Sequence, residues 1–174
     1  MVTTRGNSLH SSPRAKANTR ADKTDDAITL LTADHEKVKK LFKSFEKLSD
    51  KMVDEKEELV ADICAALTVH ATIEEELFYP AAREAFEEQD LLDEAEVEHA
   101  SAKELISQLE SMTPGDELYD AKVTVLAEYI DHHVTEEQDE MFPKIRKTKI
   151  DLKTLGAQMK ARKDELMADM SEDD

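Results

Sequence analysis

The sequence is poor in the residues that make tight turns and covalent cross-links. Its 174 residues include only 3 glycines, 4 prolines and 1 cysteine. So few glycines and prolines leave little material for the repeated turns of an all-β fold. The single cysteine, Cys64, has no partner for an internal disulfide. That fits a reducing compartment, and we expect a cytoplasmic protein.

Long apolar runs and an excess of basic charge are also missing. No stretch approaches the ~18 consecutive apolar residues of a membrane span, and the N-terminus lacks the apolar core of a secretory signal. Lys and Arg number 23 against 41 Asp and Glu, which gives a formal net charge of −18. Nucleic acid and anionic lipid both require a basic surface, so we expect neither as a partner.

What the sequence does contain favours helix. Hydrophobic residues make up 40% and charged residues 37%, and Ala, Leu, Glu and Lys are strong helix formers. The length suits one domain with tails. Residues 1–24 are basic and show no apolar periodicity, so we expect a disordered tail, with a transit peptide as the alternative. Residues 25–148 are expected to form the domain, and residues 149–174 an amphipathic helix with an acidic end.

Four amphipathic segments make up the predicted domain. Apolar residues recur in each at spacings of three and four, the signature of a helix that faces a core. The segments cover about residues 25–49, 54–79, 90–111 and 116–142. Their short connections predict an all-α fold, an antiparallel four-helix bundle of up-down-up-down order. A further segment near 151–170 would pack across the bundle or against a second copy, which suggests a monomer or a weak homodimer.

Prolines and a turn motif set the expected helix ends. Pro80 is predicted to end the second helix and Pro143 the fourth. The segment Thr113-Pro114-Gly115-Asp116 reads as a turn, with Asp116 as the N-cap of the fourth helix. The two prolines also mark an internal repeat. His70 and Glu74 precede Pro80, His133 and Glu137 precede Pro143, and the offset from His to Pro is ten in both cases (80 − 70 and 143 − 133).

Six polar residues occupy positions in these helices where the pattern calls for apolar ones. A buried carboxylate or imidazole without a partner is costly, so six in one small domain require a common cause. With a rise of ~1.5 Å per residue in every helix, all four histidines reach about the same level of the bundle. The glutamates follow two of them at i+4, on the same helical faces. The six are His35, His70, Glu74, His99, His133 and Glu137.

This set of side chains predicts a metal site. Neutral imidazole suits Fe, Zn, Cu and Ni, and a carboxylate can bridge two ions. Four nitrogens and two bridging carboxylates suit a pair of ions, with coordination positions left for water or a small gas. A lone histidine on an apolar face is more often a core residue than a ligand, but four at one level favour metal. His132 and Glu136 also stand at i, i+4, yet the apolar seam favours His133 and Glu137.

At these residues the chain resembles the hemerythrin-like, or HHE cation-binding, family. The resemblance is carried by Asp34-His35-Glu36, by residues 70–80, by Glu98-His99 and by residues 132–143. It implies a di-iron centre, bridged by two carboxylates and an oxo or hydroxo group, that binds O2 or reacts with NO, peroxide or other small oxidants. By match, the six residues above would be the iron ligands.

One position departs from the family's oxygen carriers. Those proteins place a second histidine four residues after the first in the third helix, where this sequence has Lys103. The set of four His and two Glu looks more like the iron-centre repair and stress-response branch. We expect a protein that binds or senses O2, NO or an azide-like anion. Two alternatives stay open: an enzyme that acts on NO or peroxide, and an iron donor or repair protein. Lys103 would steer an anion or donate a proton.

Overall fold

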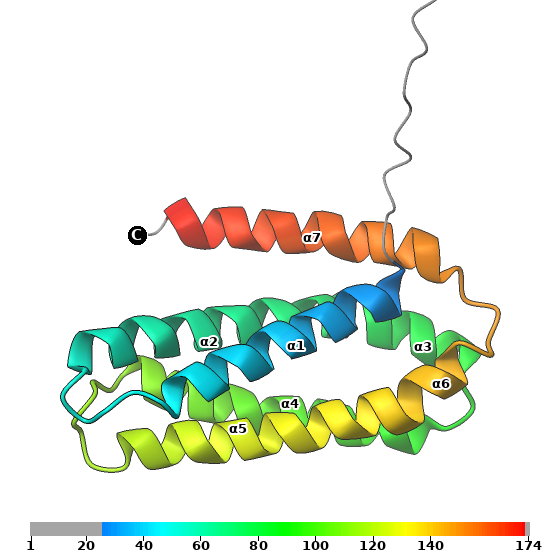
Figure 1. Ribbon diagram of the computed structural model, residues 1–174. Helices are drawn as coiled ribbons and strands as arrows, with labels where there is room; N and C mark the ends of the chain where they lie inside the picture. Colours follow the sequence, from blue (N-terminus) through cyan, green and yellow to red (C-terminus); the bar gives the residue numbers. More distant parts are fainter. Residues whose placement is uncertain (1–25, 173–174) are drawn as a thin grey trace, which may run out of the picture.

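The computed structural model describes residues 26–172, and this part of the chain is helical with no strand. Four long helices form a bundle: α1 (Ala27–Phe45), α2 (Val53–Ile73), α4 (Gln89–Glu110) and α5 (Tyr119–Glu136). Figure 1 shows them side by side along most of their length. The predicted tail, residues 1–24, lies outside the described residues, and the predicted division of the chain at residues 25 and 148 stays a prediction.

Local sequence explains where two of these helices begin. The carboxylate of Asp26 accepts a hydrogen bond from the backbone N–H of Thr29 at 2.8 Å and so caps α1. The prediction that Asp116 caps the fourth helix was wrong. Asp116 instead accepts from the backbone N–H of Thr113 at 2.8 Å and closes the turn. The helix begins three residues later, after Leu118 in a left-handed conformation with φ 70°.

The two prolines do not end their helices, which corrects a second prediction. Between α2 and α3 (Tyr79–Ala85) the chain forms a π-helical segment, η1 (Glu74–Phe78), and between α5 and α6 (Phe142–Ile145) it forms η2 (Glu137–Met141). In each segment the N–H after the last residue reaches back five residues, to the carbonyl of Glu74 or Glu137. Pro80 and Pro143 then stand in the first turn of the next helix, where no N–H is needed.

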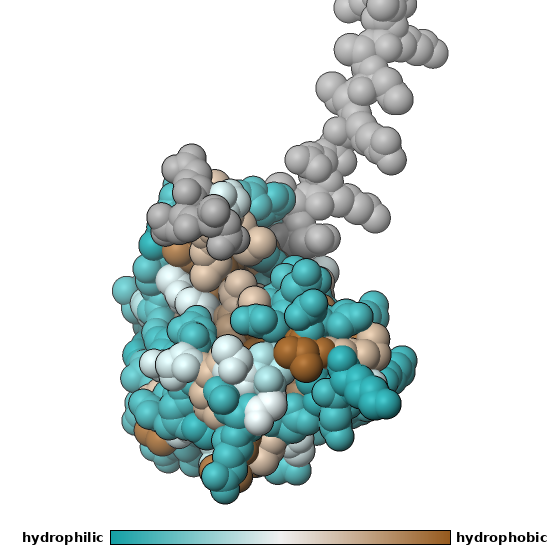
Figure 2. Space-filling view, turned by 90° about the vertical axis from the view of Figure 1, so that its left-hand side faces the viewer, coloured by the Kyte–Doolittle hydropathy of each residue, from teal (hydrophilic) through white to brown (hydrophobic). Residues whose placement is uncertain are grey.

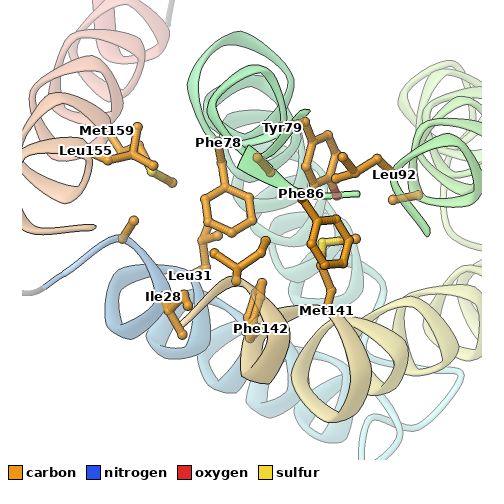
Figure 3. Packing of buried hydrophobic residues seen from close by; sticks show 14 of the residues in the cluster. Ile28, Leu31, Phe78, Tyr79, Phe86, Leu92, Met141, Phe142, Leu155 and Met159 are labelled. Carbon is orange, nitrogen blue, oxygen red and sulfur yellow. The ribbon is translucent and has the colours of Figure 1, made fainter. Parts of the chain in front are cut away.

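A seventh helix, α7 (Leu152–Glu172), lies over α1 and α2 (Figure 1). It buries Leu155 and Met159 against one end of the bundle core. Figure 3 shows these two residues facing the same cluster as Ile28, Phe78 and Phe142. The fifth predicted segment is therefore a helix that packs across the bundle, the first of the two arrangements that the sequence allowed.

The apolar core is divided into two clusters. One surrounds Leu31, Phe78 and Phe142, and the other surrounds Val38, Ile63 and Leu126. On α1, His35 stands between Leu31 of the first cluster and Val38 of the second. The six polar residues thus form a layer between two apolar regions, which keeps bulk water from reaching that layer through either cluster.

The outer surface carries the charge that composition predicts. Figure 2 looks at the end of the bundle with the α1–α2 and α4–α5 connections, and this end is mostly hydrophilic. Among the described residues, no helix is both long and apolar enough to cross a membrane.

Candidate metal centre

The structure brings all six predicted residues into the polar layer, each with its side chain buried. Glu74 is 0% and Glu137 1% exposed, and none of the four histidines exceeds 6%. Among these six residues, two groups have ligand atoms within 4.8 Å of one another. His35, His70, Glu74 and Glu137 form the first, and Glu74, His99 and His133 form the second. Glu74 belongs to both groups, as expected of a carboxylate between two ions.

The histidines approach one another in pairs through the same ring atom. Nε2 of His35 lies 3.1 Å from Nε2 of His70, and Nε2 of His99 lies 3.2 Å from Nε2 of His133. We call these the first and the second histidine pair. Each pair joins the two helices of one hairpin, α1 with α2 and α4 with α5. Two nitrogens at this separation can share one proton or bind one metal ion.

In three of the four rings, the hydrogen bond of the other nitrogen shows which of these arrangements the site favours. Nδ1 of His35 donates to Oε1 of Gln138 at 2.9 Å, and Nδ1 of His99 donates to Oε1 of Glu75 at 2.9 Å. Nδ1 of His133 donates to Oε2 of Glu98 at 2.7 Å. A proton on Nδ1 leaves the Nε2 lone pair of a neutral ring pointing inward, the arrangement usual for metal-binding histidines.

The two glutamates connect the histidine pairs. Glu74 places Oε1 3.2 Å from Nε2 of His70 and Oε2 3.2 Å from Nε2 of His99. Oε2 of Glu137 lies 3.3 Å from His35 and 3.6 Å from His133, nearer to the first pair. None of these three carboxylate oxygens has a hydrogen bond within the described residues. Buried carboxylate oxygens without donors are costly, and two bound cations would neutralise them.

The electrostatics of the layer show the same demand for positive charge. Burial opposes a charge on His70, yet the neighbouring Glu74, Asp34 and Glu137 raise its pKa to about 10. Burial likewise opposes a charge on His133, but Glu137 and Glu98 raise its pKa to about 9. For Glu74, burial works to raise the pKa, but His70 and His99 hold it well below its usual range. Protons supply the balancing charge here, and divalent cations would supply it more fully.

Tyr79 belongs to the site, although it was not among the predicted site residues. Its hydroxyl donates to Oε1 of Glu137 at 2.9 Å and lies 3.3 Å from Nε2 of His99. Burial and the nearby Glu137 and Glu74 raise the pKa of this phenol well above its ordinary value. It therefore stays protonated and acts as a hydrogen-bond donor. The sequence signal was its place within residues 70–80, one of the segments that carry the family resemblance.

Several outer partners were also missed by sequence reasoning. Glu75 and Glu98 were not among the predicted site residues, yet each accepts from a histidine of the second pair. Lys103 forms an ion pair with Glu75 at 2.5 Å, and Glu75 in turn accepts the hydrogen bond from His99. His132, which the apolar seam had disfavoured, is exposed, and its Nε2 lies 3.5 Å from Oε1 of Glu98.

A small cavity opens beside the histidines. Its volume is about 30 Å³, and all four histidines reach its wall. Most other lining residues are apolar, among them Leu67, Ala102 and Ile106, while Lys103 brings a cationic side chain. A space of this size holds about one water molecule or one diatomic gas. His35 and Ile130 also line a larger groove of about 400 Å³ between α1 and α5.

These features define a helical-bundle protein with a buried site of imidazoles and carboxylates suited to cations. Comparison with known families agrees: residues 26–145 match the Hemerythrin HHE cation binding domain. The chain belongs to this family, which confirms the resemblance seen in the motifs.

Two relatives show how far this likeness extends. A crystal structure of a hemerythrin HHE cation binding domain-containing protein from Mycobacterium kansasii has the same fold. Its TM-score is 0.72 at 24% identity, and the match covers 83% of this chain and 89% of that one. A protein described as a DNA nickase from Nostoc sp. is 32% identical over 127 residues. That match covers 72% of this chain, which spans only 35% of the relative's length.

Proposed function

We propose that this chain binds two iron ions and uses them to bind or sense O2, NO or oxidative stress. One observation carries the proposal: two pairs of Nε2 atoms, 3.1 and 3.2 Å apart, face three buried oxygens of Glu74 and Glu137 that lack hydrogen-bond donors. The first histidine pair would hold one ion and the second pair the other. Glu74 would bridge the two ions. Glu137 would be the sixth ligand, and its Oε2 lies closer to the first histidine pair than to the second.

The proposal takes the four long helices as an up-down-up-down bundle with α7 added. Contacts between α1 and α2, between α4 and α5, between α2 and α4 and between α1 and α5 support this order. In such a bundle every helix supplies one histidine at the same level. A pair of irons would supply exchangeable coordination positions and one-electron redox chemistry.

The residues around the site select for small ligands. The cavity of about 30 Å³ excludes larger molecules, and its apolar wall favours neutral diatomic gases. Lys103 on the same wall would attract a small anion such as azide. The partners proposed are therefore small gases or anions. We further propose that the protein is cytoplasmic, is a monomer or weak homodimer, and does not bind nucleic acid. The nickase activity of the Nostoc relative is not carried over, because two-thirds of that protein lies outside the match and the net charge here is −18.

The experiment is iron analysis of the purified chain together with its absorption spectrum. We expect about two irons per chain, by analogy with other carboxylate-bridged bundles, and a spectrum that changes when O2, NO or azide is added. The control is His132→Ala, which alters an exposed histidine outside the proposed ligand set and should leave both results unchanged. Iron-loaded protein with a spectrum indifferent to all three additions would overturn the proposed ligand function.

Turnover is a second candidate, favoured by Tyr79 and Lys103. The Tyr79 hydroxyl lies at the edge of the site, and Lys103 lines the cavity, so both are placed to deliver protons during reduction of peroxide or NO. Steady consumption of peroxide that Tyr79→Phe slows without loss of iron would support an enzyme. A single stoichiometric reaction would support binding or sensing. Transfer of iron to an apo-protein would instead favour the repair or donor alternative.

A further inference from the structure

The helix α7 lies outside residues 26–145, the part that matches the family, and yet it reaches the candidate metal centre. It contacts α1, α2 and η1. Two adjacent basic residues of α7 bind two different carboxylates of the bundle. Lys163 pairs with Asp34 on α1, and Arg162 pairs with Glu76 on η1 at 2.7 and 3.1 Å.

Asp34 connects Lys163 to a histidine of the site. Its Oδ1 atom accepts from Lys163, and its Oδ2 atom lies 3.5 Å from Nδ1 of His70. Within the described residues, neither that oxygen nor that nitrogen has a hydrogen-bond partner. A small movement that shortens this distance would therefore form a hydrogen bond from Nδ1 of His70 to Oδ2 of Asp34. The side chain of Asp34 is largely buried, with 12% exposed. The ammonium group of Lys163 is therefore the main positive charge from α7 that balances the Asp34 carboxylate.

The same arrangement occurs on the second histidine pair. Lys103 donates to both oxygens of Glu75, at 2.7 and 2.5 Å, and Glu75 accepts from Nδ1 of His99. In both chains a lysine holds a carboxylate, and the carboxylate orients an imidazole. The difference lies in their origin, because Lys103 comes from α4 inside the family domain whereas Lys163 comes from α7 outside it.

Arg162 provides a comparison within α7 itself. Its partner Glu76 is exposed, and no hydrogen bond or ion pair among the described residues joins it to the six candidate ligands, so this pair serves to attach α7 to the bundle. Lys163 attaches α7 too, but through the carboxylate that faces His70. The two residues therefore separate attachment of the helix from any effect on the metal site.

We propose that Lys163 is a positioning residue through which α7 controls the iron held by the first histidine pair. This inference rests on the proposed di-iron function. Lys163 fixes Asp34 beside His70 and balances its negative charge. Without that charge, Asp34 is freer to turn away from His70, and His70 holds its iron less firmly. Loss of the lysine cation near this iron also favours the more highly charged ferric state, so its reduction potential falls.

The test compares three variants of the full chain: Lys163→Met, Arg162→Met and Lys163→Arg. Each is loaded with iron, and the rate of release to a strong chelator is followed by absorbance. We expect Lys163→Met to release one of its two irons about 10-fold faster than the wild type, the low end of the effect known for outer partners of ligands. Arg162→Met removes an equal charge from the same helix and should match the wild type, and Lys163→Arg should restore slow release.

Two more variants identify which iron is affected. Lys103→Met should also accelerate release of one iron, and the double variant with Lys163→Met should accelerate both and make release a single fast phase. Redox titration of Lys163→Met should show one potential shifted downward, a change that looser packing of α7 in Arg162→Met does not produce.

The outcomes separate the two claims. A wild-type chain that fails to hold two irons would refute the proposed function. If the wild-type chain holds two irons but Lys163→Met and Arg162→Met have equal release rates and potentials, only the proposed role of Lys163 is refuted, and the proposed function stands. A double variant that still releases one iron slowly would show that both lysines act on the same ion, and would overturn the assignment to the first pair.

Discussion

At the residue scale, each histidine of the site depends on a partner that lies far away in the sequence. His35 donates to Gln138, 103 positions later, and His133 donates to Glu98, 35 positions earlier. The six candidate ligands could be predicted because each interrupts an apolar seam on its own helix. Their outer partners could not, because an acidic residue on a helix surface shows no seam, and only the packed bundle reveals which one meets an imidazole.

Tyr79 gives the first prediction at this scale. Tyr79→Phe removes the donor to Oε1 of Glu137 and leaves a buried carboxylate oxygen without a partner. We expect the metal-free protein to lose about 1–3 kcal/mol of unfolding free energy, while the iron content stays at the wild-type value. Urea denaturation and iron analysis measure the two effects. The variant Tyr129→Phe, at a half-exposed tyrosine, should be silent in both.

Cys64 gives a prediction of pH dependence. Burial, with a smaller effect of Glu110, raises the pKa of this thiol from 9.0 to about 11. Because the folded-state pKa is the higher one, the protonated thiol stabilises the fold below pH 9, and this contribution is lost as the pH rises from 9 through 11. Alkylation of the folded protein by iodoacetamide should therefore be slow at pH 8 and increase toward pH 11. Rapid alkylation at pH 8, equal to that in urea, would contradict a buried thiol.

At the scale of elements, the two π-helical segments are the feature that the sequence did not predict. The helical spacing of apolar residues was recognised up to each proline, and proline normally ends a helix. The π register adds one residue at Glu74 and at Glu137, and this extra residue lets each proline enter the first turn of a new helix. The spacing of apolar residues does not reveal where the backbone hydrogen bonds change from a span of four residues to a span of five. The repeated offset from His to Pro did indicate that both segments share one geometry.

Deletion of Glu140 tests this explanation. Glu140 is an exposed residue of η2. Removing it would restore the α register and rotate Met141 and Phe142 by about 100° relative to α5, and both are buried. We expect a loss of several kcal/mol in unfolding free energy, comparable to large core truncations. Glu140→Ala keeps the register and should change the midpoint of thermal unfolding very little. An equally stable deletion variant would show that the π segment is not needed for packing.

At the scale of the whole molecule, the bundle and α7 enclose two apolar clusters with a polar layer between them. Helix formation and the four segments could be predicted from composition and periodicity, and the family from the resemblance of the histidine and glutamate motifs. The place of α7 could not, because its apolar seam fits either this bundle or a second copy. The structure resolves that choice through Leu155 and Met159, which pack on the cluster around Ile28.

Truncation after residue 148 tests the contribution of α7. The shortened chain exposes the surface covered by Leu155 and Met159, each of which contributes roughly 1.5–3 kcal/mol when fully buried. We expect the unfolding free energy of the metal-free chain to fall by about 3–6 kcal/mol, as measured by urea denaturation. The control is Arg162→Met, which removes an ion pair between α7 and the bundle but leaves the apolar contact in place. A truncated chain as stable as the full one would show that the contact of α7 with the apolar cluster does not contribute to stability.

The most direct test of the central claim is anomalous X-ray diffraction at the iron absorption edge, from crystals of the iron-loaded chain. The account predicts two peaks between the helices, one beside Nε2 of His35 and His70 and the other beside Nε2 of His99 and His133, with Glu74 between them. A single peak, peaks on the acidic surface, or an empty layer between the two apolar clusters would contradict it.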